Sequence, residues 1–162
     1  MTRTGRFASC AVVLLTTWAA SAAHGQTMGA AASPTLAEAR KMLAAAQAAA
    51  AKANANLSCA VVDARGDIVS IERGDKARFF TVDVARGKAL TSATFGAPSA
   101  NVANLASSPL FPGINASAQG RMYPMQGAVP LTRNSQVLGA IGCSGGTGQQ
   151  DEDAAKSGAA AL

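Results

Sequence analysis

Histidine and tryptophan are nearly absent from this sequence, which has one of each, at His24 and Trp18. Both lie in an N-terminal segment that has the features of a cleaved signal peptide, so the remaining chain contains no histidine. A protein without histidine cannot build a His-based catalytic triad, an HExxH zinc site or a proximal histidine ligand on haem iron. These absences exclude whole classes of enzyme and metal site.

A long apolar run is lacking as well. The N-terminal run from Ala8 to Ala20 is shorter than the roughly 20 residues that a membrane-spanning helix needs. It follows Arg3 and Arg6 and precedes small residues at cleavage spacing, which is typical of a secretory signal peptide. We therefore predict a cleaved signal over residues 1–25, a flexible leader over 26–34 and one folded domain over 35–162. The expected location is periplasmic or secreted, without stable membrane insertion after cleavage; an uncleaved anchor is the alternative.

The charge is neither strong nor clustered. The net charge of +5 falls to +3 when Arg3 and Arg6 leave with the signal. The chain has no basic run and no basic helix face, so nucleic acid is not an expected partner.

Cysteine is scarce, and only Cys59 and Cys143 remain after cleavage of the signal. Two cysteines do not complete a zinc site, and their separation excludes a CxxC redox pair. Each alternates with apolar residues in a strand-like run, so both are expected to face the core. Two interpretations stay open: two small buried hydrophobic residues, or a cross-strand disulfide, which an oxidising compartment permits.

The pattern of the remaining residues predicts an α+β domain. Capping boxes at Thr35…Glu38 and Thr147…Gln150 begin two helices, the first running to about Lys52. A third helix is expected over residues 79–95, and Ser99 is expected to cap a short helix through residue 105. Residues 107–120 show no regular pattern and predict a long loop, of a kind that is usually functional.

Alternating strand patterns predict one antiparallel sheet. A hairpin covers residues 57–73, and two further strands cover residues 127–131 and 136–144. Arg121–Met125 is expected to be a short edge strand, because Pro124 cannot donate to a ladder. The prediction is a central sheet of about five strands with flanking helices.

Motifs in four parts of the chain resemble one known family. They comprise residues 60–66 with Arg73, residues 83–89 with 95–98, residues 127–131, and residues 139–147 with 150–152. On these residues the sequence resembles the GlcG/HbpS-like family, and the C-terminal domain of PduO-type cobalamin adenosyltransferases is similar. The resemblance spans Leu36 to the end of the chain. It implies a profilin-like fold, a homo-oligomer, and binding of a tetrapyrrole, principally haem, with a corrinoid as the alternative.

The sequence departs from the family pattern at two places. Met125 and Gln126 precede a single Gly127 where the family often has three glycines, so these two side chains either crowd the site or line it. Gly87 stands where an aspartate commonly precedes the helix lysine, here Lys88.

A haem site requires an apolar slot, cations for the propionates and, in many proteins, an axial ligand. With histidine absent, the candidate axial ligands are Met122, Tyr123 and Met125, since thioether and phenolate both occur on haem iron. Each of the three can equally be a packing residue. Cations are expected from Arg121, as a fork donor to a propionate, and from Lys88, whose partner would be a propionate or Glu72. Phe95, with Phe79 and Phe80, is expected to form one wall or part of the core.

Three functions are compatible with the sequence. The expected one is a secreted haem-binding protein that acts in haem scavenging, storage or sensing. The alternatives are an enzyme that acts on haem or a related small molecule, and a structural or interaction subunit without a ligand. No general base with suitable partners is evident, so the enzyme ranks below the haem-binding protein. The glycine turn Ser144–Gly148 is not expected to bind phosphate, because Asp151–Asp153 already place negative charge there.

Overall fold

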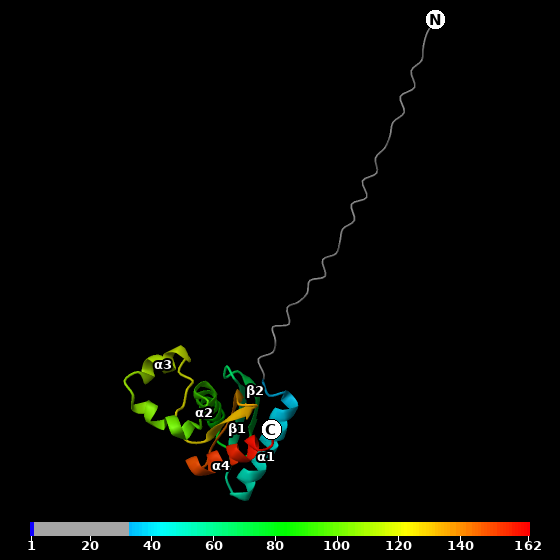
Figure 1. Cartoon of the computed structure of the whole chain (residues 1–162). Helices are drawn as coiled ribbons and strands as arrows, with labels where there is room; N and C mark the ends of the chain where they lie inside the picture. The colour runs from blue at the N-terminus through cyan, green and yellow to red at the C-terminus, as the bar shows by residue number, and fades with distance from the viewer. Residues whose placement is uncertain (2–32) are drawn as a thin grey trace.

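The computed structural model describes Met1 and residues 33–162, and the expected signal peptide and most of the leader lie outside the described residues. Figure 1 shows the arrangement of the elements around one sheet. In chain order they are α1 (Leu36–Lys52), β1 (Ser58–Asp63), β2 (Ile68–Arg73), α2 (Thr81–Phe95), the 3-10 helix η1 (Ser99–Ser107), α3 (Phe111–Ser117), β3 (Ala128–Arg133), β4 (Gln136–Ser144) and α4 (Gly148–Ala159).

The sheet is antiparallel, with the strand order β2-β1-β4-β3. The first and last strands of the chain, β1 and β4, therefore form its centre, and they pair from Ser58↔Ser144 to Asp63↔Gly139. Both are buried over most of their length, and β-branched or small residues fill them. The expected α+β class is confirmed, with four strands in the sheet.

Helices cover the two faces of the sheet. Helix α2 packs across β1, β4 and β3 on one face, while α1 and α4 pack together on the other. The close approach of α2 depends on Gly142, because a Cβ at this position would lie 2.6 Å from the carbonyl oxygen of Ala85. On the opposite face, Met42 and Leu43 of α1 and Ile141 of β4 are fully buried in the main core.

A disulfide joins the two central strands. Cys59 and Cys143 are direct partners in the β1–β4 ladder, with their Cα atoms 4.1 Å apart and their sulfur atoms bonded. Both side chains are fully buried within the main core. The bond therefore connects the centre of the sheet across a sequence separation of 84 residues.

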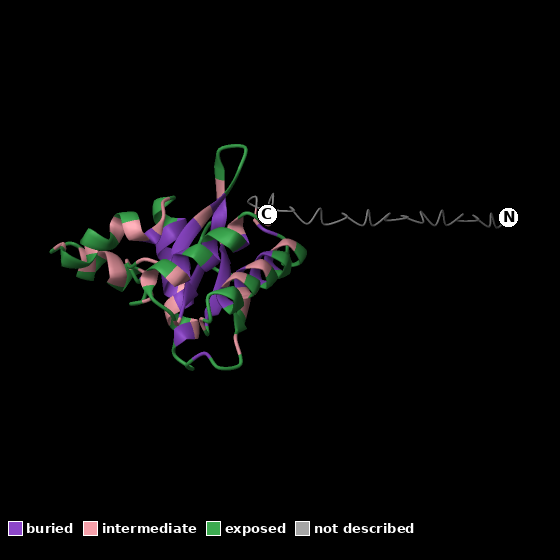
Figure 2. Ribbon diagram, turned by 90° about the horizontal axis from the view of Figure 1, so that it is seen from below, coloured by how far each residue is buried: buried purple, intermediate pink, exposed green. Residues whose placement is uncertain are grey.

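Residues 99–120 form an arm beside α2, which contains the expected short helix as η1 (Ser99–Ser107) but differs from the expected loop over residues 107–120. The arm contains η1 and α3, and no residue from 100 to 120 is buried (Figures 1 and 2). Ser99 does not cap η1; its hydroxyl accepts from the backbone amide of Ala128 at 3.0 Å instead. The expected loop over residues 107–120 was wrong for Phe111–Ser117. These residues form a short helix, α3, with a proline in its first turn.

Arg121–Met125 does not form the expected edge strand. The backbone amide of Tyr123 donates to the Thr91 hydroxyl of α2 at 3.0 Å, not to a neighbouring strand. The segment thus packs against α2, and among the described residues the sheet ends at β3. Within the part of the chain that the structure describes, no helix is both long and apolar enough to cross a membrane.

Candidate functional site

An open cavity of about 390 Å³ lies between α2, the segment after Tyr123 and the turn that follows β4. This volume is within the range of small-molecule sites, about 300–1,000 Å³. Three stretches that are far apart in sequence contribute to it: residues 78–88, 123–126 and 144–151. The sheet and α2 bring these stretches together, since α2 packs against β4 and β4 leads into the turn.

One wall of the cavity is apolar and partly open to solvent. Phe80, Val84 and Met125 line it, with the ring of Tyr123 beside them. Phe80 is 43% exposed and Met125 47% exposed, a high value for large apolar side chains. The guanidinium of Arg78 lies 5.1 Å from the centre of the Phe80 ring, which places a cation at the cavity's edge.

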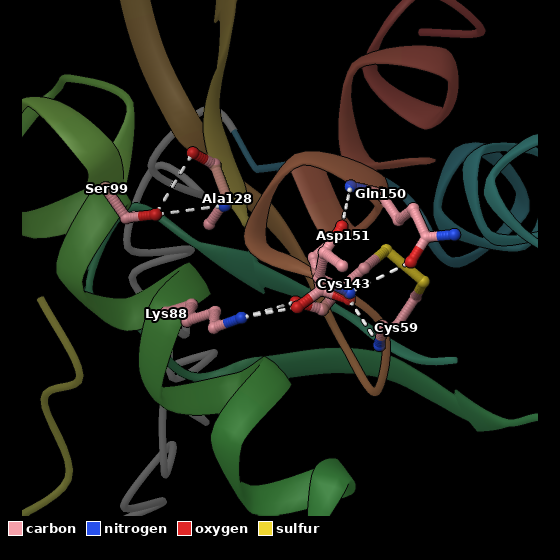
Figure 3. Close-up of polar contacts among 9 residues, drawn as sticks. Cys59, Lys88, Ser99, Ala128, Cys143, Gln150 and Asp151 are labelled. Carbon is pink, nitrogen blue, oxygen red and sulfur yellow. Dashed lines mark hydrogen bonds and ion pairs between the residues drawn. A yellow bond between two sulfur atoms is a disulfide. The ribbon is translucent and has the colours of Figure 1, made fainter. Parts of the chain in front are cut away.

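A buried ion pair forms the polar end of the cavity. The Lys88 ammonium on α2 donates to Asp151 Oδ2 on α4 at 2.7 Å and to the carbonyl oxygen of Cys143 at 3.3 Å (Figure 3). Both side chains of the pair are at least 96% buried. The anion that Lys88 meets is therefore Asp151, and the expectation of Glu72 was wrong, because Glu72 is exposed on β2. The charge of Lys88 is already balanced before any ligand binds.

The glycine turn after β4 brings bare backbone to the cavity. Gly145 has φ = +137°, and a Cβ there would lie 2.4 Å from the carbonyl oxygen of Asn56. The amide of Gly146 donates to Asp151 Oδ1 at 3.0 Å. This amide is therefore engaged by a carboxylate of the protein itself.

Tyr123 lies on α2 at the one position where the helix has no side chain. A Cβ on Gly87 would lie 2.0 Å from Tyr123 Cδ2 and 2.6 Å from the carbonyl oxygen of Arg121. Gly87 therefore makes room for the Tyr123 ring, which gives a physical reason for its departure from the family pattern. The second departure is also explained, since Met125 and Gln126 both line the cavity.

The structure brings together three of the six residues that the sequence indicated for the site. Lys88, Tyr123 and Met125 line the cavity. Met122 is 7% exposed and, with Arg121, lines a different pocket against the arm; Phe95 lies at the end of α2, outside the cavity. The segment crosses α2 at Gly87, so residues on either side of Tyr123 face different directions.

Arg78 and Asp151 were missed by the sequence reasoning. Arg78 precedes α2 in a stretch without regular periodicity, and its position over the Phe80 ring is seen only in the folded chain. The sequence indicated Asp151 only as part of the negative charge at the start of the last helix, because its pairing with Lys88 spans 63 residues and leaves no local pattern. Within residues 33–162, no group of three or more His, Cys, Asp or Glu residues could hold a metal ion.

Comparison with known proteins gives a family match over nearly the whole described chain. The family model described as "Haem degrading protein HbpS-like" matches residues 35–160. An uncharacterized 15.0 kDa protein from the dhaT-dhaS intergenic region of Citrobacter freundii is 34% identical over 119 residues, which cover 72% of this chain and 83% of that protein.

Solved structures share the fold. The crystal structure of HbpS is 32% identical, has a TM-score of 0.74, and aligns over 87% of this chain and 98% of its own. A crystal structure of PduOC in complex with haem aligns over 80% of this chain and 95% of its own, with a TM-score of 0.71. At 23% identity the latter likeness concerns the fold alone.

Proposed function

Because the chain belongs to the HbpS-like family, we propose that it binds haem in the cavity between α2 and the glycine turn. The observation that carries the proposal is the make-up of this cavity. Apolar side chains, a thioether and a phenol meet there at a partly open surface. A flat, mostly apolar ring system with an iron centre matches this combination.

The donor set of the cavity is compatible with haem. Tyr123 and Met125 both line it, and phenolate and thioether sulfur are known haem-iron ligands. Lys88 is a poor ligand, because its ammonium donates to Asp151 and to a backbone carbonyl. Bound haem would supply a redox-active iron, and the protein would hold the ring through Phe80 and Val84 and place Tyr123 or Met125 near the metal. Binding is expected to be modest, since the cavity is open and offers no imidazole.

The proposed location is the periplasm or the outside of the cell, where the protein would scavenge, store or sense haem. Two features support this. The N-terminal sequence has the features of a secretory signal, and a disulfide between Cys59 and Cys143 is expected to persist only in an oxidising compartment.

We further propose that the protein assembles with copies of itself. Residues 89–120 contain no charged residue, and large apolar side chains are exposed on the arm and beside the cavity, including Leu110 at 73% and Phe79 at 79%. Apolar surface of this kind marks an interaction site. An uncharged arm is compatible with the same arm of a second copy, since no like charges oppose each other.

Titration of the full chain with haemin tests the proposal. We expect a shifted, saturable Soret band. In the Y123F/M125L double variant, which keeps bulk but removes both ligating atoms, we expect a changed Soret position and at least about tenfold weaker binding, corresponding to about 1.4 kcal/mol.

The matched control is M122L, because Met122 lies outside the cavity and should leave both the band and the affinity unchanged. An unshifted Soret band at stoichiometric wild-type protein would refute haem binding. Equal spectra of wild type and Y123F/M125L would show that the ligand assignment is wrong.

A further inference from the structure

A second, smaller pocket lies on the other side of Tyr123 from the main cavity. It has a volume of about 230 Å³ and is lined by Asp83, Arg86, Gly120, Arg121 and Tyr123. We propose that this pocket binds a carboxylate of the molecule that occupies the main cavity. The inference rests on the proposed function, which it extends from the ring system of haem to its propionate side chains.

Arg86 gives the first argument. Its Nε atom is buried and has no hydrogen-bond acceptor among the described residues. A buried N–H without an acceptor is costly, and charge-assisted bonds to an oxyanion are the strongest way to satisfy a guanidinium. The orphaned donor therefore indicates that an acceptor from outside the chain belongs here.

Arg121 gives the second argument. Its Nε donates to the carbonyl oxygen of Ala118 at 3.0 Å, which holds the guanidinium in place. The two terminal nitrogens can then donate to a ligand. Within residues 33–162, neither Arg86 nor Arg121 forms an ion pair with a carboxylate. Two guanidinium groups thus line one small pocket, and neither lies within ion-pair distance of a carboxylate of the described residues.

The charges in the pocket define the ligand class. Arg86 and Arg121 contribute two positive charges and Asp83 one negative charge, so one positive charge remains. A single carboxylate balances it. A dianionic group would meet the Asp83 carboxylate as an additional repulsion.

The geometry of α2 connects the two pockets. Val84 and Lys88 lie four residues apart and face the main cavity, whereas Asp83 and Arg86 lie three residues apart and face the small pocket. Gly87 separates these two faces, and the Tyr123 ring covers it and lines both pockets. When a ligand lies in the main cavity, a flexible side chain of that ligand can therefore pass the edge of the Tyr123 ring and bring its carboxylate to Arg86.

The test compares haemin with haemin dimethyl ester, in which both propionates are esterified. Wild type, R86Q and R121Q are titrated with each. For haemin we expect about tenfold or weaker binding in each variant; for the ester we expect equal binding in all three proteins. The control is R40Q, since Arg40 is exposed on α1 and should leave both ligands unaffected.

The outcomes separate this proposal from haem binding itself. If the variants bind both ligands equally more weakly, or bind both as wild type does, the arginines do not bind the carboxylate and the proposal is overturned. If haemin does not bind even to wild type, haem binding fails, and the pocket is tested directly with acetate. A saturable shift of the Arg86 Nε–H NMR signal on adding acetate, absent in R121Q, would then support the carboxylate site; no shift would overturn it.

Discussion

Lys88 and Asp151 illustrate how a single pair of residues connects distant elements. Lys88 belongs to α2, Asp151 to α4, and the carboxylate also accepts from the amide of Gly146 in the glycine turn. The pair therefore fixes the polar end of the cavity from three directions. A buried pair of this kind adds little net stability, but the loss of one partner leaves an uncompensated buried charge.

Replacing Lys88 by methionine is expected to destabilise the fold by about 3–5 kcal/mol, because Asp151 would remain buried without its cation. The K88M/D151N double variant should be more stable than K88M. It removes the stranded charge and keeps Oδ1 as an acceptor for Gly146. Urea denaturation of wild type, K88M, D151N and K88M/D151N gives the four free energies of unfolding that measure both effects.

The control for this cycle is K41M, which removes an exposed lysine from α1 and should change stability by less than about 0.5 kcal/mol. A K88M variant as stable as K41M would mean that Lys88 is not paired as described.

The two capping boxes show which elements the sequence could predict. Thr35 with Glu38 and Thr147 with Gln150 were expected as helix starts, and both pairs form the reciprocal hydrogen bonds of a capping box. A capping box depends on residues only three positions apart, so it can be read locally. The path of Arg121–Met125 could not be predicted locally, because the Tyr123 amide donates to Thr91 on α2, 32 residues away.

The first capping box also carries an electrostatic effect. The backbone amide of Thr35, and then the guanidinium of Arg133 on β3, lower the pKa of Glu38 from 4.5 to about 2. A lowered folded-state pKa means that Glu38 contributes stability above pH 4.5, and that this contribution is lost as the pH falls from there toward about 2.

In E38Q, the loss of stability that comes from protonation of Glu38 between pH 4.5 and about 2 should be absent. The E38Q variant should be less stable than wild type at pH 7, and the difference should shrink as the pH falls through this window. Urea midpoints between pH 7 and pH 2 measure it. E72Q, which removes an exposed carboxylate on β2 outside the capping box, is the matched control. A constant offset between E38Q and wild type at every pH would contradict the assignment.

At the scale of the whole molecule, the four strands of the sheet and its helices were predictable, but of the arm only the short helix at its start was. Alternating patterns indicated the strands, and 3.6-residue periodicity indicated α2. Residues 107–120 have neither pattern, because none of them is buried in the single chain. For the same reason only part of the site was found, since the orientation of Arg121, Met122 and Phe95 depends on how α2 meets this arm and the segment after it.

The exposed arm predicts self-association through Leu110. We expect L110E to lower the mass of the assembly measured by size-exclusion chromatography with light scattering, because a buried carboxylate at the contact is unfavourable. N104E, which adds the same charge at an exposed polar position of the arm, is the matched control. A wild-type chain that is monomeric at all accessible concentrations would contradict the assembly.

The disulfide at the centre of the sheet has a consequence for proteolysis. Cys59 precedes the arm in the sequence and Cys143 follows it. A protease that cuts the exposed arm therefore produces two polypeptides that stay covalently joined through the core. Trypsin has no cleavage site from residue 89 to residue 120, since this stretch lacks lysine and arginine. The chain can thus be cut within the exposed arm and still migrate as one molecule until the buried sulfurs are reduced.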